Sequence, residues 1–470
     1  MNSQSIPRLL IAATGSGAGK TTATIALIGA LRARGMRVGA FKCGSDYLDP
    51  TYHRRAAGAP SHNLDGWMMD RASVLATFAR AAAGADVAVI EGMMGLFDGA
   101  TPTSDEGSSA EIAKWLAAPV LLVVDASGMA RTVAAVAHGF ARFDPHLKLA
   151  GLICNRVGGR GHLDLLRAAS AEVPVLGGFS SEGRFAFPER HLGLLSADEK
   201  TVAQQSFDAW AELAERWLDL DAIVAIAKSA PLLSVPQIAE LWPRSGAPGP
   251  RCRIAVAWDD AFHFYYEDNL RRLEAAGADL VHFAPTREAR LPEVDGLYFG
   301  GGYPEALAAD LSGNEAMIDA VRSFARKGGP IYAECGGLMY LSESIRTLDG
   351  RSWPMVGLVA GEAVMSERLQ ALGYVEVETR VESVLGPGGL QMRGHQFRYS
   401  TLTPIPERME CVYAVRPRWG EAFVEGYRTG NVLASYVHIH WASNPKAAEG
   451  FVNSCAAWRA QNRRPPPGER

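Results

Sequence analysis

The sequence has no apolar run long enough to cross a membrane and no surplus of basic residues. None of its apolar stretches reaches the roughly 18 residues that a membrane-spanning helix needs. The 470 residues include 47 Lys and Arg against 51 Asp and Glu, which gives a formal net charge of −4. Sequence-independent binding to nucleic acid needs a net basic surface. We therefore expect neither a membrane nor a nucleic acid as a partner.

Cysteine is also scarce, and its residues stand singly along the chain. No CxxC pair occurs, which argues against a zinc ribbon and against a disulfide scaffold. The N-terminus has neither a basic stretch before its first apolar run nor a small-residue cleavage site after it, so we expect a cytoplasmic protein with free thiols. Each thiol is then a core residue or a nucleophile; the six are Cys43, Cys154, Cys252, Cys335, Cys411 and Cys455.

Short apolar runs alternate with longer amphipathic stretches throughout the chain, whose length suits two or three domains. Helical stretches such as 21–35 and 73–85 separate these runs. The runs are rich in β-branched residues and almost free of charge, which is typical of strands buried on both faces of a parallel sheet. This alternation predicts a doubly wound α/β domain. In the first half the runs lie at 9–13, 38–43, 87–92, 120–126 and 149–155.

A stretch rich in Pro, Gly and Ser interrupts this pattern at 229–250 and predicts a linker. The alternation of strands and helices restarts with an apolar run at 253–260. We therefore predict an α/β fold with two doubly wound domains, the first at 1–228 and a flavodoxin-like second one at 251–458. The polar, Pro-rich end at 459–470 is expected to be a disordered tail.

A glycine-rich loop, ATGSGAGKTT, lies between the first predicted strand and a predicted helix. In this setting Gly17 and Gly19 let backbone N–H groups turn towards phosphate, and Lys20 reaches the terminal phosphates. Thr21 or Thr22 offers a hydroxyl to Mg²⁺. The usual pattern GxxxxGK[ST] begins with a glycine where this chain has threonine, but the Gly-Lys-Thr-Thr core is intact. The loop predicts a P-loop NTPase-like domain that binds ATP and Mg²⁺.

Polar residues end three further predicted strands of the first half. The carboxyl ends of parallel strands form the ligand-binding edge of an open sheet. Glu91 ends one strand and could hold Mg²⁺ directly or through water. Lys42, Asp46 and Asp49 follow another and suit a metal, a phosphate or a substrate carboxylate. Asn155 ends a third, where its amide could read a nucleobase edge or cap a turn.

Cys335 is the one cysteine whose setting predicts a nucleophile. It directly follows an apolar strand and precedes a helix in PIYAECGGLMYL, which is the order of a nucleophile elbow. A helix N-terminus stabilises a thiolate. The N–H of Gly336 would face an oxyanion, and a second donor could come from the run of Gly300, Gly301 and Gly302 that ends another predicted strand.

The thiol needs a base, and the residues alone leave three histidines as candidates. His438 and His440 lie two positions apart on a predicted strand and therefore share a face, so periodicity cannot choose between them. His395, in MRGHQFRYS, is the third candidate.

The ordered set of motifs resembles one family, the cobyrinic or hydrogenobyrinic acid a,c-diamide synthases of cobalamin biosynthesis. The resemblance covers nearly the whole chain and implies a dethiobiotin-synthetase-like P-loop domain followed by a class I glutamine amidotransferase domain. It implies a ligase that uses ATP and glutamine to amidate the a and c acetate groups of a corrin through acyl phosphates. It rests on ATGSGAGKTT, FKCGSDYLDP, VAVIEGMMGLFDG, ICNRV, FGGGYPE, AECGGLMYL, RGHQF and SYVHIHWASNP.

The resemblance also implies a role for one of the histidines. It favours His438 as the partner of Cys335 in glutamine hydrolysis. Class I amidotransferases usually carry a glutamate two positions after that histidine, where this chain has His440. The resemblance therefore implies a Cys–His dyad and leaves open what orients His438.

In the first domain, the resemblance places Asp46, Asp49 and Glu91 at the edge that binds the corrin and ATP–Mg²⁺, and it makes Asn155 an adenine contact. The implied partners are a corrin polycarboxylate, ATP and L-glutamine, and a homodimer is the expected assembly. Nickel-sirohydrochlorin a,c-diamide synthases and cobyric acid synthases share both domains, and the former differ mainly in their macrocycle. An alternative from another class is a partitioning-type ATPase with a deviant P-loop, which would not carry Cys335.

Overall fold

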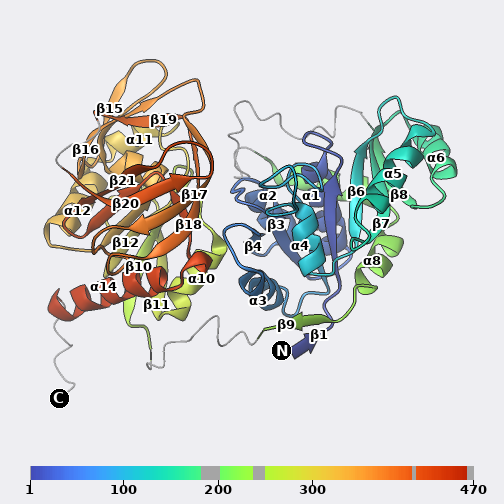
Figure 1. The fold of residues 1–470 in the computed structure, drawn as a ribbon. Helices are drawn as coiled ribbons and strands as arrows, with labels where there is room; N and C mark the ends of the chain where they lie inside the picture. Colours follow the sequence, from blue (N-terminus) through green and yellow to red (C-terminus); the bar gives the residue numbers. More distant parts are fainter. Residues whose placement is uncertain (1, 181–201, 237–248, 405–408, 463–470) are drawn as a thin grey trace. The chain divides into compact units, whose positions relative to one another are not determined.

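The structure, a computed structural model, describes residues 2–180, 202–236, 249–404 and 409–462 (Figure 1). The chain divides into two compact units, Met1–Leu241 and Trp242–Arg470, and each unit has its own large sheet. Within the described residues, no helix combines the length and the apolar character that crossing a membrane requires.

The first unit is built on a seven-stranded sheet in which all neighbouring strands are parallel. Its order is β4-β3-β5-β2-β6-β7-β8, and the five predicted apolar runs correspond to β2, β3, β5, β6 and β7. The sequence patterns do not predict β4, because its residues, SHNL, are mostly polar. The strands are β2 (Arg8–Ala13), β3 (Val38–Cys43), β4 (Ser61–Leu64), β5 (Val87–Glu91), β6 (Val120–Asp125), β7 (Leu149–Val157) and β8 (Val175–Ser180).

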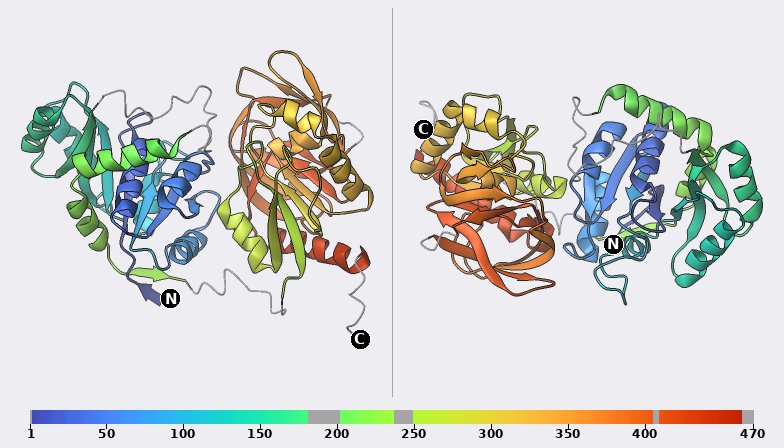
Figure 2. Two further views of the ribbon diagram at one scale, coloured as in Figure 1. Left: turned by 180° about the vertical axis from the view of Figure 1, so that it is seen from behind. Right: turned by 90° about the horizontal axis from the view of Figure 1, so that it is seen from above.

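Helices cover both faces of this sheet (Figure 2). Four of them share a core with Leu9 and Ile11 of β2, namely α1 (Lys20–Ala33), α2 (Asp49–Ala57), α7 (Gln204–Trp217) and α8 (Leu220–Lys228). On the opposite face, Phe78 of α3 (Arg71–Ala81) packs against Phe41 of β3, with ring centroids 4.9 Å apart. The remaining described helices are α4 (Ser109–Trp115), α5 (Thr132–Phe143) and α6 (Arg160–Ala169). Because all strands are parallel, the loops after β2, β3, β5 and β7 meet at one edge.

Part of the predicted linker, 229–250, belongs to the first unit. β9 (Leu233–Val235) pairs antiparallel with β1 (Asn2–Gln4). Leu233 and Val235 are buried while Ser234 is exposed. This alternation covers only three residues and has prolines close by, so the sequence pattern does not identify β9 as a strand. The remainder of the predicted linker from 237 to 248 lies outside the described residues.

Arg8, at the start of β2, is fully buried and is bound by backbone carbonyls. Its guanidinium donates to four of them, the carbonyls of Ile6, Leu116, Ala117 and Pro231, and burial lowers the pKa of Arg8 to about 10. We expect Arg8→Met to destabilise the first unit by about 2–4 kcal/mol, because it leaves buried carbonyls without donors.

Pulse proteolysis in increasing urea, with peptides of the first unit quantified by mass spectrometry, measures this loss. Arg37→Met is the matched control, because the Arg37 side chain is 73% exposed and pairs with Asp86 at the surface. Equal urea midpoints for the two variants would show that the buried guanidinium contributes no more than an exposed one.

The second unit contains a ten-stranded sheet with a parallel and an antiparallel half. Its parallel half has the order β11-β10-β12-β13-β22, which in chain order is the 2-1-3-4-5 arrangement of flavodoxin-like folds. The predicted α/β class with two doubly wound domains is thereby confirmed. These strands are β10 (Cys252–Ala257), β11 (Ala278–Phe283), β12 (Gly296–Phe299), β13 (Ile331–Glu334) and β22 (Val432–Ser435).

The antiparallel half continues the sheet as β21-β20-β17-β18-β23, and of these strands the sequence patterns predict only β23, the strand that carries His438 and His440. These strands are β17 (Ala371–Thr379), β18 (Gln391–Arg398), β20 (Glu410–Pro417), β21 (Phe423–Thr429) and β23 (His438–His440). A separate sheet has the order β15-β14-β16-β19, formed by β14 (Ser342–Arg346), β15 (Ser352–Pro354), β16 (Val359–Met365) and β19 (Ser400–Thr403).

The helices of the second unit are α10 (Glu267–Ala275), α11 (Ala308–Gly313), α12 (Glu315–Arg326), α13 (Gly336–Leu341) and α14 (Lys446–Asn462). The last of these corrects the prediction of a disordered tail at 459–470, because α14 continues to residue 462. Phe451, Val452 and Cys455 of α14 are buried against the sheet, and this packing carries the helix past the predicted boundary. Residues 463–470 lie outside the described part of the chain.

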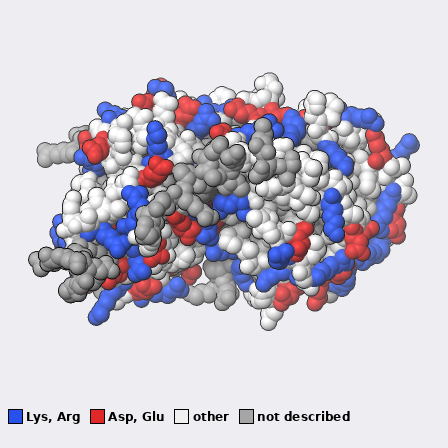
Figure 3. Space-filling model, turned by 90° about the horizontal axis from the view of Figure 1, so that it is seen from below, with Lys and Arg blue, Asp and Glu red and all other residues white. Residues whose placement is uncertain are grey.

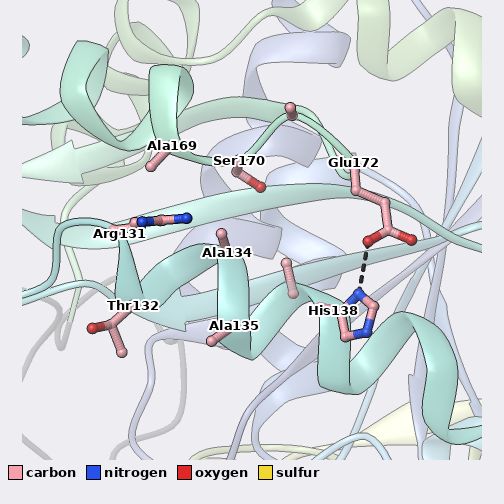
Figure 4. A pocket seen from close by; sticks show the side chains of 10 residues that line it. Arg131, Thr132, Ala134, Ala135, His138, Ala169, Ser170 and Glu172 are labelled. Atoms are coloured by element: carbon pink, nitrogen blue, oxygen red, sulfur yellow. Dashed lines mark hydrogen bonds and ion pairs between the residues drawn. The ribbon is translucent and has the colours of Figure 1, made fainter.

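Basic and acidic side chains are interspersed over the face of the molecule shown in Figure 3. A shallow hollow of about 600 Å³ lies between α5 and the turn that precedes β8 (Figure 4). Five alanines and Ser170 form much of its wall, and His138 pairs with Glu172 at 2.9 Å on one side. None of the residues that the sequence marks as functional lines this hollow.

Candidate active sites

The predicted phosphate loop connects β2 to α1. Gly19, directly before α1, has a left-handed backbone with a φ of 96°, and a Cβ at this position would lie 2.1 Å from Nδ2 of Asn155. Asn155 lies against the loop and donates from Nδ2 to the carbonyl of Ala18 at 2.9 Å. Gly17 also has a left-handed backbone, with a φ of 77°. The structure therefore brings the end of β7 to the phosphate loop.

Lys20 is the first residue of α1 and is 8% exposed. Its Nζ donates to the carbonyl of Met94 at 2.6 Å. Burial lowers the pKa of Lys20, and the nearby charge of Lys42 lowers it further. Thr22 lies half-buried in the first turn of the same helix. The lysine head therefore lies between the phosphate loop and the loop that follows β5.

Thr21, Lys42, Asp49 and Glu91 meet in one cluster next to the phosphate loop. Thr21 donates from Oγ1 to Oε1 of Glu91 at 2.7 Å. The Nζ of Lys42 lies 2.8 Å from Oδ2 of Asp49 and 3.1 Å from Oε1 of Glu91. Burial alone would lower the pKa of Lys42, but the two carboxylates raise it well above its usual value. Lys42 is therefore a fixed buried cation.

His53 supports this cluster, although the sequence patterns do not single it out. Its Nε2 lies 2.6 Å from Oε2 of Glu91, and its Nδ1 lies 3.3 Å from Oγ of Ser61. The side chains of His53 and Glu91 are both fully buried. His53 comes four residues after Asp49 on α2, and this spacing places both on one face of the helix. That spacing is the signal that could have identified it.

Asp46 begins the turn into α2. Its Oδ1 accepts from the backbone N–H groups of Leu48 at 2.7 Å and Asp49 at 3.0 Å. Asn63 of β4 holds the same turn, because its Nδ2 donates to the carbonyls of Gly44 and Asp46. One carboxylate oxygen of Asp46 thus stabilises the turn. A contact between Asp46 and the substrate stays a prediction.

Among the residues that the structure describes, no group of three or more His, Cys, Asp or Glu side chains is arranged to hold a metal ion. The hydroxyl of Thr21 and the carboxylate of Glu91 are nevertheless hard oxygen donors. Mg²⁺ is usually held by one or two carboxylates together with substrate phosphates and water. This donor set therefore fits a Mg²⁺ that arrives with a nucleotide.

Cys335 lies on the turn between β13 and α13. Its φ of 48° and ψ of −102° are strained values for a residue with a side chain, and such strain is a feature of nucleophile elbows. The N–H of Cys335 donates to the carbonyl of Ser435 at 2.7 Å, which ties the turn to β22. Its Sγ lies 3.9 Å from the carbonyl oxygen of Phe397, and the residue is 7% exposed.

Two glycines near Cys335 allow neighbouring segments to pack closely against the elbow. A Cβ on Gly336 would lie 3.0 Å from the backbone nitrogen of Gly302, and a Cβ on Gly301 would lie 2.4 Å from Cε1 of His438. The N–H of Gly301 donates to the carbonyl of Phe264 at 3.2 Å, so it is used within the fold. The geometry therefore favours Gly302 over Gly301 as the second oxyanion donor beside Gly336.

β23 brings His438 to Cys335. Burial alone would lower the pKa of His438, but its contacts with Cys335 and Glu334 outweigh burial and raise this pKa to about 9. The imidazole therefore holds a proton at neutral pH, next to the thiol. This arrangement is that of a Cys–His pair in which the histidine can give a proton to a leaving group.

The other two histidines have different surroundings. The Nδ1 of His440 accepts from the N–H of Ala442 at 3.3 Å, and burial lowers the pKa of His440 to about 4. His395 lies opposite His438 in the pairing of β18 with β23. Burial, together with the charge of His438, lowers the pKa of His395 to about 3. Both rings are therefore neutral, and the geometry favours His438 as the partner of Cys335.

The two units define a class of protein, a glutamine-dependent ligase that forms amides with a P-loop nucleotide-binding unit and a class I glutamine amidotransferase unit. Residues 9–186 match the CobQ/CobB/MinD/ParA nucleotide binding domain family, and residues 253–446 match the CobB/CobQ-like glutamine amidotransferase domain family. The chain belongs to the cobyrinate a,c-diamide synthase family.

Curated members of this family resemble the chain along almost their whole length. The cobyrinate a,c-diamide synthase of Leptospira interrogans is 53% identical over 96% of this chain and 98% of its own. Those of Syntrophotalea carbinolica and Priestia megaterium are 46% and 40% identical, over 96% and 97% of this chain and 99% and 98% of their own. The resemblance seen in the motifs is thereby confirmed. A partitioning-type ATPase does not account for the match at 253–446.

Proposed function

We propose that this chain converts the a and c acetate carboxylates of cobyrinic or hydrogenobyrinic acid into amides, with ATP and glutamine as co-substrates, in the cytoplasm. The observation that carries the proposal is that one chain holds both a phosphate loop with a buried lysine and an elbow cysteine beside the buried side chain of His438. The curated relatives are named for this reaction on cobyrinate.

In the second unit, Sγ of Cys335 attacks the side-chain amide carbon of glutamine. A thioester forms, the C–N bond breaks, and His438 gives its proton to the departing ammonia. The N–H groups of Gly336 and Gly302 would stabilise the oxyanion that develops on the amide oxygen. Water then hydrolyses the thioester, which releases glutamate and regenerates the thiol. The strained turn at Cys335 keeps Sγ at a fixed place throughout.

In the first unit, a carboxylate oxygen of the corrin attacks the terminal phosphorus of ATP, and ADP leaves. The acyl phosphate is a good electrophile where a carboxylate is a poor one, so ammonia can displace phosphate and leave a carboxamide. Lys20 and the N–H groups of the loop at Gly17 and Gly19 would hold the phosphates in line. Mg²⁺ supplies positive charge against these phosphates when it is bound, and Thr21 and Glu91 would hold it.

The other polar residues of this edge would position the substrates. Lys42 is bound between Asp49 and Glu91, so we assign it the task of fixing the two carboxylates. Asp46 and Asp49 lie at the start of α2, where we place the corrin, and Asn155 lies against the loop, where we place the adenine. A corrin with many carboxylates also requires local positive charge, which a net charge of −4 does not reveal.

Mass spectrometry of the macrocycle tests the proposal. With cobyrinic or hydrogenobyrinic acid, ATP–Mg²⁺ and glutamine, we expect two successive acid-to-amide conversions, and none when ATP or the nitrogen source is withheld. Nickel-sirohydrochlorin is the comparison substrate. Amidation of that macrocycle, with both corrins left unchanged, would favour the alternative substrate and contradict the proposal.

A further inference from the structure

Glu334, the residue directly before the nucleophile, is a buried carboxylate beside His438. Its Oε2 lies 3.8 Å from Nδ1 of His438, and each of the two side chains is 2% exposed. Glu334 ends β13, so the strand that delivers Cys335 also delivers this carboxylate. The sequence gives no signal for it, because a charged residue next to a nucleophile is usually read as part of an exposed turn.

Three neutral donors hold the carboxylate in place. Tyr298 donates from its hydroxyl to Oε2 at 2.9 Å, while the Tyr332 hydroxyl and the Ile439 N–H donate to Oε1 at 2.8 and 3.0 Å. Burial and the charge of Glu334 raise the pKa of both tyrosines well above its usual value, so they remain donors. A buried carboxylate held in this way needs a nearby cation as well as hydrogen bonds.

His438 is the cation that the structure places at this carboxylate. The titratable groups that face its ring are Cys335 and Glu334 from β13 and its turn, and His395 from β18. His395 is neutral because burial lowers its pKa to about 3, and Cys335 is the group that reacts. The 3.8 Å contact is a charge contact rather than a hydrogen bond, and such contacts can tighten when substrate binds.

We propose that Glu334 is the positioning residue of the glutaminase site, which orients the His438 ring and stabilises its imidazolium through Nδ1. In class I amidotransferases, a glutamate two positions after the histidine usually orients the histidine ring in this way. Here that position is His440, whose ring contacts Tyr266 and whose Nδ1 accepts from the backbone at Ala442. The carboxylate thus comes instead from the end of β13, which pairs with β12 and β22 rather than with β23. This inference rests on the glutaminase activity proposed above.

Glu334→Gln tests the inference, because it keeps the shape of the side chain and removes its charge. We expect glutamine hydrolysis to lose kcat by about tenfold or more with little change in KM. The alkaline limb of its pH profile should move down by about one unit or more, because the imidazolium loses an opposite charge. Amidation from free ammonia should stay at the wild-type rate.

Glu425→Gln is the matched control. Glu425 is a buried carboxylate of the same unit, but it accepts from the Ser435 hydroxyl and the Tyr436 N–H. This variant should leave the alkaline limb in place. If wild-type protein releases no glutamate from glutamine, the proposed function fails; if wild-type is active and Glu334→Gln keeps both its kcat and its alkaline limb, only this inference fails.

A second variant keeps the test decisive even if Glu334→Gln does not fold. Tyr298→Phe removes one donor from Oε2, the oxygen that faces His438. The carboxylate then carries more charge towards the imidazolium, so the alkaline limb should move up, opposite to the effect of Glu334→Gln. Structural damage alone would not reverse the direction. A limb that stays in place or moves down in Tyr298→Phe would overturn the inference.

Discussion

Replacing Cys335 by alanine is expected to abolish amidation from glutamine and to leave amidation from free ammonia unchanged. The thiol is the group that forms the thioester, and removal of a nucleophile of this kind costs about 10³-fold or more in rate. Alanine keeps the Cβ, so it fits the same strained backbone at a φ of 48°. The phosphate loop lies in the other unit and keeps its residues. Activation of the corrin carboxylate should therefore continue.

Two assays separate these outcomes, glutamate release from glutamine and corrin amidation with an ammonium salt. Cys411→Ala is the matched control, because Cys411 is a half-buried thiol on β20 and should leave both assays unchanged. His438→Ala should reproduce the loss seen without the thiol. If Cys335→Ala loses amidation from ammonia as well, the two chemistries are not separable as proposed. If His440→Ala and not His438→Ala removes glutaminase activity, the assignment of the histidine is wrong.

The parallel strands of the two sheets could be predicted, because a strand that is buried on both faces appears in the sequence as a nearly uncharged apolar run. Strands such as β2 and β6 are apolar except for one charged residue at an end of each, so each appears as a short run between helical stretches. The antiparallel strands are harder to recognise in the sequence, because buried residues are interspersed with exposed and half-buried ones along β17 and β20. The polar strand β4 has no apolar run.

Some residues of the candidate sites could also be predicted from the sequence, and others could not. Lys20 and Cys335 were predictable because each belongs to a local motif in which glycines admit a ligand or a sharp turn. His53 and Glu334 act through contacts between elements that are distant in sequence, Glu91 in one case and His438 in the other. The spacing of His53 from Asp49 could have placed both residues on one face of α2, but neither pattern nor spacing encodes the partner that His53 or Glu334 contacts on another element. The choice of His438 over His440 needed the family resemblance for the same reason.

Replacing Lys20 by alanine is expected to stop amidation from both glutamine and ammonia, while glutamine hydrolysis continues. Lys20 is the cation at the start of α1 that can reach the terminal phosphates. Removing one preorganised positive group from a phosphoryl-transfer site costs about 10²–10³-fold or more. Lys42 cannot substitute for it, because Asp49 and Glu91 bind its Nζ within the cluster.

Three assays test this expectation for Lys20→Ala. They measure corrin amidation with each nitrogen source, ATP consumption, and glutamate release from glutamine. Lys148→Ala is the control, because Lys148 is exposed and bonds to Ser229 at the surface. If Lys20→Ala amidates the corrin at the wild-type rate, the loop does not carry the phosphoryl transfer. Because Lys20 and Cys335 lie in different units, loss of glutamate release in this variant would mean that nucleotide binding governs glutamine hydrolysis. We expect Cys335→Ala to lose only the use of glutamine and Lys20→Ala to lose only the amidation of the corrin. This pair of results would show that one chain performs two separate reactions, and that the ammonia released by the first is consumed by the second.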